Sequence, residues 1–144
     1  MDALTLPGTL DSLPMIRDYV REIGEKAGLD RKALYRLKLA VDEIATNIVT
    51  HGYEDAGLVG DIVISSSLQP SALTIQLEDT SQEYNPYGLE APGHLDKPIS
   101  ERPIGGLGVF LAVRGVDEFR YEYVNGRNLH TFMVKIPSSQ PQSS

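Results

Sequence analysis

The sequence predicts an α+β fold: a two-layer α/β sandwich whose mixed, mostly antiparallel sheet carries its helices on one face. Helical spacing of apolar residues dominates the first third of the chain, and strict alternation begins near residue 61. The predicted order is strand, two helices, two strands, long loop, helix and hairpin. With 144 residues, 41% of them hydrophobic, the chain fits one domain, over residues 1–136, before a low-complexity tail at 137–144 that we expect to be disordered.

The first elements follow from short local signals. The apolar run at residues 3–6 is typical of an edge strand. A helix is expected to start at Asp11 or Ser12, with Pro14 in its first turn, and to run to about Gly28. Its apolar residues keep the spacing of one buried face.

A second helix is expected to start at Asp30, a residue type suited to the N-cap, and to fray near Gly52. The segments "DIVISSSL" and "ALTIQLED" then alternate as strands of a half-buried antiparallel sheet. Gln69-Pro70-Ser71 forms the turn between them.

Residues 80–104 hold four prolines and two glycines and show no sustained period. A run of that length without regular structure is uncommon in a compact domain and is typical of a functional lid or a linker. A glycine turn then opens a short helix in "GGLGVFLAVRGVDEF". The last segment, "FRYEYVNGRNLHTFMVKI", predicts a hairpin that turns at Asn125-Gly126.

Composition excludes several classes of function. A net charge of −7 argues against a surface that coats nucleic acid or binds lipid, because phosphate-rich partners require Lys and Arg. Zero cysteines exclude a disulfide framework, a thiolate metal site and a Cys nucleophile. No run approaches the ~18 apolar residues of a membrane span, and the N-terminus lacks a signal-peptide pattern. We therefore expect a cytoplasmic protein with no nucleic-acid or membrane partner.

The second helix carries Glu43, Asn47 and His51 along one margin of its apolar stripe. Two interpretations remain open at this point. The three residues form a solvated polar margin, which is common at boundary positions. Alternatively they face an oxygen-rich cleft, in which Asn47 offers a carbonyl oxygen to Mg²⁺ and Glu43 accepts a proton from an attacking hydroxyl.

Other residues have a structural and a functional interpretation too. Asp79 is either a solvated strand end or an acceptor for the exocyclic amine of a purine. Gly105, Gly106 and Gly108 form a common glycine-rich helix start, or they let a phosphate approach backbone N–H groups. Thr131 is a good strand former whose hydroxyl could support a base bound by Asp79.

The ordered set of these motifs resembles a known family. "LKLAVDEIATNIVTHGY", "QLED", "RPIGGLGVFLAVRGVDEFRY" and "NGRNLHTFMVK" are similar to segments of the anti-sigma-factor serine/threonine protein kinases, small members of the GHKL superfamily. The resemblance implies the GHKL (Bergerat) fold of a histidine-kinase-like ATPase domain, with ATP and Mg²⁺ bound. It also implies a homodimer that binds a STAS-domain anti-anti-sigma protein and an RNA polymerase sigma factor.

The resemblance assigns roles to the polar residues. Asn47 matches the Mg²⁺ ligand of the N box, and Glu43 matches its general base. Asp79 matches the residue that binds the adenine amine, with Thr131 assisting through water. His51 matches a residue that lines the pocket, although a structural role fits it equally well.

The same resemblance makes the loop at about residues 80–104 the ATP lid. Phosphate contacts would come from the backbone and cations at its end, and the candidates are Lys97, Arg102, Gly105, Gly106, Leu107 and Gly108.

One position departs from the family pattern, because Asp79-Thr80-Ser81 stands where Asp-x-Gly is usual. The Cβ of Ser81 predicts either a tighter pocket or a different backbone path. Two functions follow from this: a protein kinase, which the intact Glu43 and Asn47 favour, or an ATP-binding adaptor that sequesters a partner without phosphorylating it.

Overall fold

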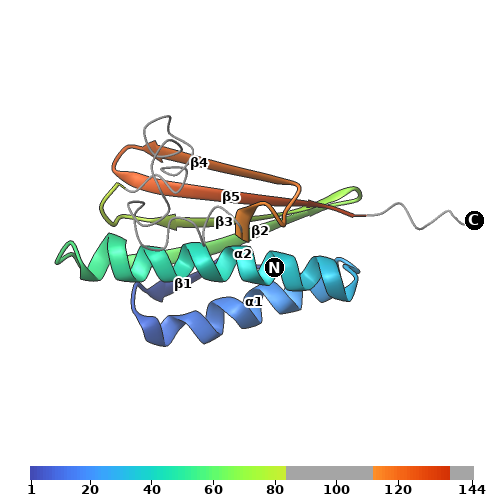
Figure 1. Ribbon diagram of the computed structural model, residues 1–144, viewed down its shortest axis with the longest axis horizontal. Helices are drawn as coiled ribbons and strands as arrows, with labels where there is room; N and C mark the ends of the chain where they lie inside the picture. The colour runs from blue at the N-terminus through green and yellow to red at the C-terminus, as the bar shows by residue number, and fades with distance from the viewer. Residues whose placement is uncertain (84–111, 137–144) are drawn as a thin grey trace, which may run out of the picture.

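The computed structural model describes residues 1–83 and 112–136, which form a five-stranded sheet with two helices on one face (Figure 1). In chain order the elements are β1 (Leu4–Pro7), the 3₁₀ turn η1 (Leu10–Ser12), α1 (Leu13–Lys26), α2 (Arg31–Asn47), the π-helical η2 (Ile48–Glu54), β2 (Asp61–Gln69), β3 (Ala72–Asp79), β4 (Glu118–Val124) and β5 (Arg127–Lys135). The two-layer α+β prediction is confirmed.

The strand order is β1-β2-β3-β5-β4, and each of the four pairings between described strands is antiparallel. The sheet of the described residues is thus antiparallel throughout, rather than mixed. Both predicted hairpins are present. In the β4–β5 hairpin, Asn125 has φ 54° and Gly126 has φ 77°, the left-handed pair that a two-residue type I′ turn requires. β1 forms one edge of the sheet, as the short apolar run at residues 3–6 predicted.

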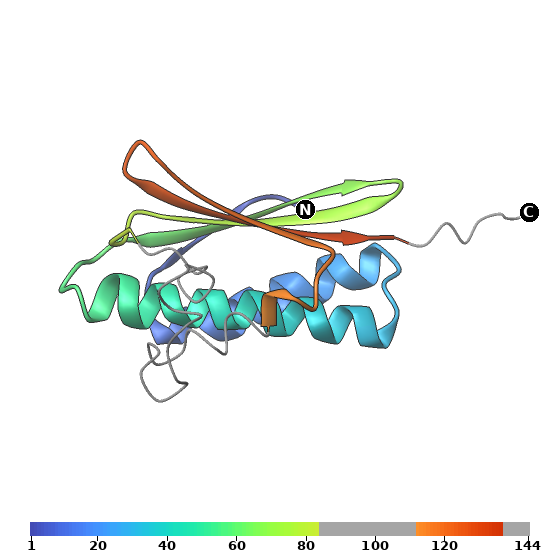
Figure 2. The ribbon, with the colours of Figure 1, turned by 45° about the horizontal axis from the view of Figure 1, so that its top comes forward.

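The core lies between the sheet and the helices, which run along the same face (Figure 2). Alternation places every second residue of β3 and β5 on this side, so Leu73, Ile75 and Leu77 are buried together with Phe132 and Val134. The residues between them lie on the opposite face of the sheet. This alternation decides which polar side chains can meet the helices.

Helix α1 begins one residue after Ser12, but the Ser12 hydroxyl does not cap the helix; it donates to the Pro7 carbonyl at 2.7 Å. The helix ends at Lys26, two residues before the predicted end. Gly28 takes φ 78°, and the N–H groups of Gly28 and Leu29 donate to the carbonyls of Glu25 and Gly24. These two bonds form a Schellman motif, in which glycine is favoured because of its positive φ.

Helix α2 begins at the predicted N-cap, where the Asp30 carboxylate accepts from the Ala33 N–H at 2.7 Å. The helical segment ends at Glu54, close to the predicted end near Gly52, but its last part is π-helical rather than α-helical. The chain continues past Asn47 as a π-helix to Glu54, with its end marked by a bond from the Asp55 N–H to the Thr50 carbonyl. Burial holds this unusual segment, because Ile48, Val49 and Tyr53 all lie in the core. Single π-helical turns are frequent at functional sites.

The predicted lid, almost all of the glycine turn and its helix, and the tail lie outside the described residues. Ala112 and Val113, at the expected helix position, are helical and buried. Among residues 1–83 and 112–136, no helix has the length and apolar character needed to cross a membrane.

Candidate functional site

Asp79 is the last residue of β3, and its carboxylate points toward the helices because alternation places it on the same side as Leu77. The residue is 1% exposed, so it is not the solvated strand end that the sequence left open. Burial raises the pKa of this carboxyl group, the hydrogen bonds from Ser81 and Asn128 lower it again in part, and the charge of Glu78 adds to the rise. A buried carboxylate is costly unless something compensates it.

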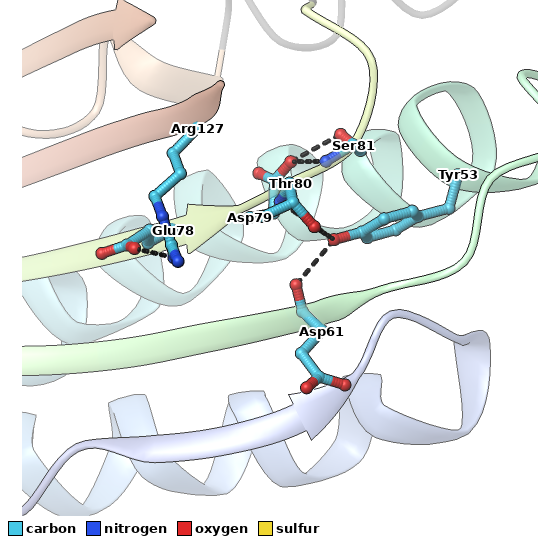
Figure 3. A network of polar contacts seen from close by, with 7 residues as sticks. All are labelled: Tyr53, Asp61, Glu78, Asp79, Thr80, Ser81 and Arg127. Atoms are coloured by element: carbon cyan, nitrogen blue, oxygen red, sulfur yellow. Dashed lines mark hydrogen bonds and ion pairs between the residues drawn. The ribbon is translucent and has the colours of Figure 1, made fainter. Parts of the chain in front are cut away.

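The two carboxylate oxygens of Asp79 have unequal surroundings (Figure 3). Oδ1 accepts from the Ser81 N–H at 2.9 Å, from the Ser81 hydroxyl at 2.5 Å and from the Asn128 side-chain amide at 3.0 Å. Oδ2 is buried and has no hydrogen-bond partner among the described residues. One oxygen is therefore saturated, and the other has its acceptor capacity unused.

Ser81 occupies space that Gly52 leaves open. A Cβ built on Gly52 would lie 2.8 Å from the Cβ of Ser81, and the Gln82 N–H donates to the Gly52 carbonyl at 3.1 Å. The extra side chain at position 81 is therefore matched by a missing one in η2. These contacts also place the exit of β3 directly against the helical segment that continues α2.

Asn47 and Glu43 lie one turn apart near the end of α2, but Asn47 is more deeply buried than Glu43. Asn47 is 5% exposed, and its Nδ2 is buried with no partner among the described residues. Glu43 is half-buried; burial, with a smaller contribution from the charge of Asp42, raises its carboxyl pKa. A solvated margin does not describe Asn47.

His51, one turn further, belongs to η2. Its Nδ1 lies 2.8 Å from an Asp55 carboxylate oxygen, and its side chain is 36% exposed. This contact fits the structural role that the sequence allowed for His51.

Thr131 does not lie where the sequence placed it. It is three residues from Asn128 along β5, so alternation puts it on the sheet face opposite to Asp79. Its hydroxyl accepts from the Gln76 side-chain amide at 3.3 Å on that outer face. The proposed water-mediated assistance of Thr131 to Asp79 is therefore wrong for geometric reasons.

Asn128 takes the place expected of Thr131 and was missed from the sequence. It pairs with Asp79 across β3 and β5 and is fully buried. The sequence did hold a signal. Counting from the Asn125-Gly126 turn puts Asn128 on the same face as Phe132, which is the face that Asp79 shares with Leu77.

Tyr53 ties the end of the helical segment to two strands (Figure 3). Its hydroxyl donates to the Asp61 carbonyl at 2.7 Å and accepts from the Thr80 N–H at 3.1 Å. Its ring fills space above Gly8 and Gly60, where any Cβ would collide with it. The backbone that follows Asp79 is thereby held at a fixed distance from η2.

The remaining site predictions lie outside the described residues. They concern Lys97, Arg102, Gly105, Gly106, Leu107 and Gly108. A surface hollow of about 400 Å³ lies elsewhere, between the N-terminus, β1 and α1, where Met15 and Tyr19 contribute to its wall.

The described residues fit a polar ligand that bridges the end of α2 and the end of β3. A buried polar atom left without a partner costs roughly 1–3 kcal/mol. Two such atoms, Asp79 Oδ2 and Asn47 Nδ2, belong to side chains of these two ends. The donor set also suits Mg²⁺ shared with phosphates, since that ion takes oxygen ligands and needs few from the protein.

Comparison with known proteins agrees with the fold. The family model described as "Histidine kinase-like ATPase domain" matches residues 6–135. Among curated relatives, the "Serine-protein kinase RsbW" of Halalkalibacterium halodurans is 31% identical over 111 residues, covering 75% of this chain and 67% of its own. The protein of the same name from Bacillus mycoides is 26% identical over 126 residues, covering 85% and 78%.

Solved structures support the fold. The histidine kinase domain of the Erythrobacter litoralis EL346 blue-light activated histidine kinase superposes with a TM-score of 0.52 at 18% identity, over 86% of this chain and 59% of that one. The Acinetobacter baumannii histidine kinase AdeS gives a TM-score of 0.52 at 12% identity, over 94% and 68%. This chain thus spans less than two thirds of the first structure. With its sheet, its helices and its match over most of the chain, the protein belongs to the histidine kinase-like ATPase domain family, as an RsbW-like member of the GHKL superfamily.

Proposed function

We propose that this protein is an ATP-dependent serine/threonine protein kinase and anti-sigma factor that phosphorylates a STAS-domain anti-anti-sigma partner. One observation carries the proposal. The buried Asp79 Oδ2 has no partner among the described residues, and it lies at the strand end that packs against the continuation of the helix bearing Glu43 and Asn47. The similarity to proteins named serine-protein kinases supports the same activity.

Each residue has a task in this proposal. Asp79 accepts a hydrogen bond from the exocyclic amine of adenine through Oδ2. Asn47 would hold Mg²⁺ through its side-chain oxygen, and Mg²⁺ bound there would supply neutralisation of the phosphate charge. The residues from Gly105 to Gly108, with Lys97 or Arg102, remain candidates for contacts to the phosphates.

Glu43 is the proposed general base. Burial, with a smaller contribution from the charge of Asp42, raises the pKa of its carboxyl group, which makes it a stronger proton acceptor than an ordinary glutamate. The serine or threonine oxygen of the partner forms a bond to the γ-phosphorus of ATP as the bond to the β-phosphate oxygen breaks. The hydroxyl proton passes to Glu43, and ADP leaves. Positioning and charge neutralisation supply most of the rate in such transfers.

The partners follow from the same proposal. A homodimer of this chain binds either a sigma factor or a STAS-domain protein, and each excludes the other. Phosphorylation of the STAS protein releases it, so that the kinase is again available to hold the sigma factor. The reaction thereby couples ATP to the choice of partner.

A transfer assay tests the activity. The protein is mixed with γ-labelled ATP, Mg²⁺ and the STAS-domain protein encoded nearest to it. Label is expected on the STAS protein, and Glu43→Gln or Asn47→Ala should lower its rate at least about 100-fold, since general-base catalysis alone contributes 10²–10⁴-fold. Glu25→Gln, which alters an exposed carboxylate on α1, is the matched control and should leave the rate unchanged.

Two results would replace the kinase proposal. Binding of Mg²⁺–ATP without transfer of label would make the protein an adaptor that sequesters its partner. No change in Tm at saturating Mg²⁺–ATP would show that the protein does not bind ATP, because a ligand at 100 times its Kd stabilises the folded state by about 2.7 kcal/mol. The presence of Ser81 in place of the usual glycine gives the adaptor only weak support, because the absence of a side chain at Gly52 leaves space for Ser81.

A further inference from the structure

The unequal surroundings of the two Asp79 oxygens also fix the orientation of the carboxylate. All three donors that reach the carboxylate among the described residues converge on Oδ1. A carboxylate held at one oxygen by three donors from two directions cannot rotate without breaking them. Its second oxygen then has a fixed position and direction.

The Asn128 amide is oriented by a group on the edge strand. The Tyr121 hydroxyl of β4 donates to Asn128 Oδ1 at 2.5 Å, which leaves Nδ2 facing Asp79. The same Nδ2 lies 3.2 Å from the carbonyls of both Ser81 and Gln82. Asn128 therefore holds the carboxylate and the backbone that leaves β3 at once.

Ser81 contributes the shortest of the three bonds to Asp79 Oδ1. Its hydroxyl also lies 3.4 Å from the Gln82 carbonyl, and its side chain is 4% exposed. The space for it exists because residue 52 is glycine. A glycine at position 81 would keep the backbone N–H bond to Asp79 and lose the hydroxyl bond.

On the basis of the proposed nucleotide site, we propose that Ser81 and Asn128 are positioning residues that saturate Asp79 Oδ1 and leave Oδ2 as the acceptor that selects an adenine base. An acceptor fixed at this point pairs with the exocyclic amine of adenine. It opposes the carbonyl oxygen that hypoxanthine carries at the same ring position. Two facing acceptors leave a buried polar group unpaired, which is a strong basis for rejection.

A purely structural role for the two side chains makes a different prediction. If Ser81 and Asn128 only stabilise a buried carboxylate, their loss loosens the site and weakens all nucleotides alike. If they fix the direction of Oδ2, their loss weakens ATP more than ITP. The ratio of the two affinities separates these roles, because a general loosening cancels in it.

The experiment measures the Kd of ATP and of ITP, each with Mg²⁺, by calorimetry on the full chain. Wild type should prefer ATP, and Ser81→Ala should lower the ATP:ITP preference roughly tenfold, as expected when a charge-assisted hydrogen bond of about 1.4 kcal/mol or more is lost. Ser81→Gly, which also removes the Cβ, should show the same loss and serves if Ser81→Ala does not fold. Ser67→Ala, an exposed hydroxyl on β2, is the control and should keep the preference.

The outcomes are distinguishable. A wild type that binds neither nucleotide overturns the proposed function and this inference with it. A wild type that prefers ATP, with folded Ser81 variants that keep the full preference, overturns the inference alone. A loss of the ATP:ITP preference with Ser81→Gly but not with Ser81→Ala also overturns the inference, since that pattern reflects the space taken by the Cβ rather than the hydroxyl hydrogen bond.

Discussion

The carboxyl group of Asp79 ionises in a place where burial opposes its charge. Three donors compensate one of its oxygens, while the other gains nothing from the described protein. Such an arrangement lowers the stability of the free protein and is useful only if a ligand completes it. Natural proteins commonly give up stability in this way at functional sites.

Asp79→Asn should therefore raise the Tm of the free protein by a few degrees, since about 1 kcal/mol shifts the Tm of a domain by roughly 2–8 °C. The neutral amide keeps an acceptor toward Ser81 and Asn128 and removes the buried charge. The same change should abolish the ATP-induced rise in Tm. Thermal unfolding with and without Mg²⁺–ATP checks both effects, with the exposed Asp61→Asn as control. A variant that melts lower but still responds to ATP would show that Asp79 is only structural.

The gain from Asp79→Asn should also depend on pH. Because the folded pKa of Asp79 is raised above its ordinary value of 3.8, the folded chain holds this proton more tightly than the unfolded chain. Stability from this group is present below that value and is lost as the pH rises through the raised pKa. Urea unfolding should therefore show a larger difference between variant and wild type at pH 7 than at pH 4.

The effect of His130 on the pH dependence of stability is opposite to that of Asp79. His130 is a buried residue of β5, close to the rings of Phe119 and Tyr121 on β4, and burial lowers its pKa to about 4. The unfolded chain takes up this proton near pH 6.5 and the folded chain does not, so stability falls as the pH drops from 6.5 toward 4.

His130→Phe should remove this dependence. Relative to the variant, wild type should lose up to about 1.4 kcal/mol of unfolding free energy per pH unit across that window. Urea titrations at pH 6.5, 5.5 and 4.5 measure it. Phe119→Leu, which disturbs the same rings without a titratable group, should shift stability equally at all three values. Parallel curves for His130→Phe and wild type would contradict the assignment.

At the scale of elements, the π-helical η2 and the exit of β3 pack closely and are joined by hydrogen bonds. Gly52 and Ser81 share one space, Gln82 bonds to the Gly52 carbonyl, and Tyr53 bonds to Thr80. These contacts join the helix that carries Asn47 to the strand that carries Asp79. The distance between the two proposed ligand contacts depends on this junction.

A double-mutant cycle tests the junction. Gly52→Ala should destabilise by roughly 1–3 kcal/mol, the usual cost of overpacking, because the new Cβ meets Ser81. In the Ser81→Gly background the same change should be neutral or stabilising, since alanine is the better helix former and Gly52 has no positive φ. Urea unfolding of the four proteins gives the coupling energy. Equal effects of Gly52→Ala in both backgrounds would mean that the two residues do not share space.

Sequence patterns predicted the elements better than their junctions. Alternation, the Asp30 cap and the Asn125-Gly126 turn depend on a few neighbouring residues, and these predictions are confirmed. The π-helical continuation of α2 from Ile48 to Glu54 depends on burial in the core, which no local signal encodes. The resemblance implies a role for Thr131 at the base, but it does not include the strand register set by the turn. That register places Asn128, not Thr131, beside Asp79.

At the scale of the whole molecule, two helices cover one face of the sheet (Figure 2), and the contacts of Gly52 with Ser81 and Gln82 bring the continuation of α2 against the exit of β3. The fold class could be predicted because the helical period of 3.6 residues in the first part of the chain gives way to the strand period of 2 near residue 61. The polar residues of the candidate site could be named from the sequence only in part. Glu43, Asn47 and Asp79 came from spacing and resemblance, whereas the roles of Ser81, Asn128 and Tyr53 required the pairing of strands distant in sequence.

The central claim is that one nucleotide contacts Asn47 and Asp79 together. A crystal structure of the protein with Mg²⁺ and a non-hydrolysable ATP analogue measures it directly. The account predicts the adenine amine within hydrogen-bonding distance of Asp79 Oδ2 and the ion on the side-chain oxygen of Asn47. A base bound elsewhere, or an Asp79 Oδ2 that bonds to another protein group while the nucleotide is present, would contradict it.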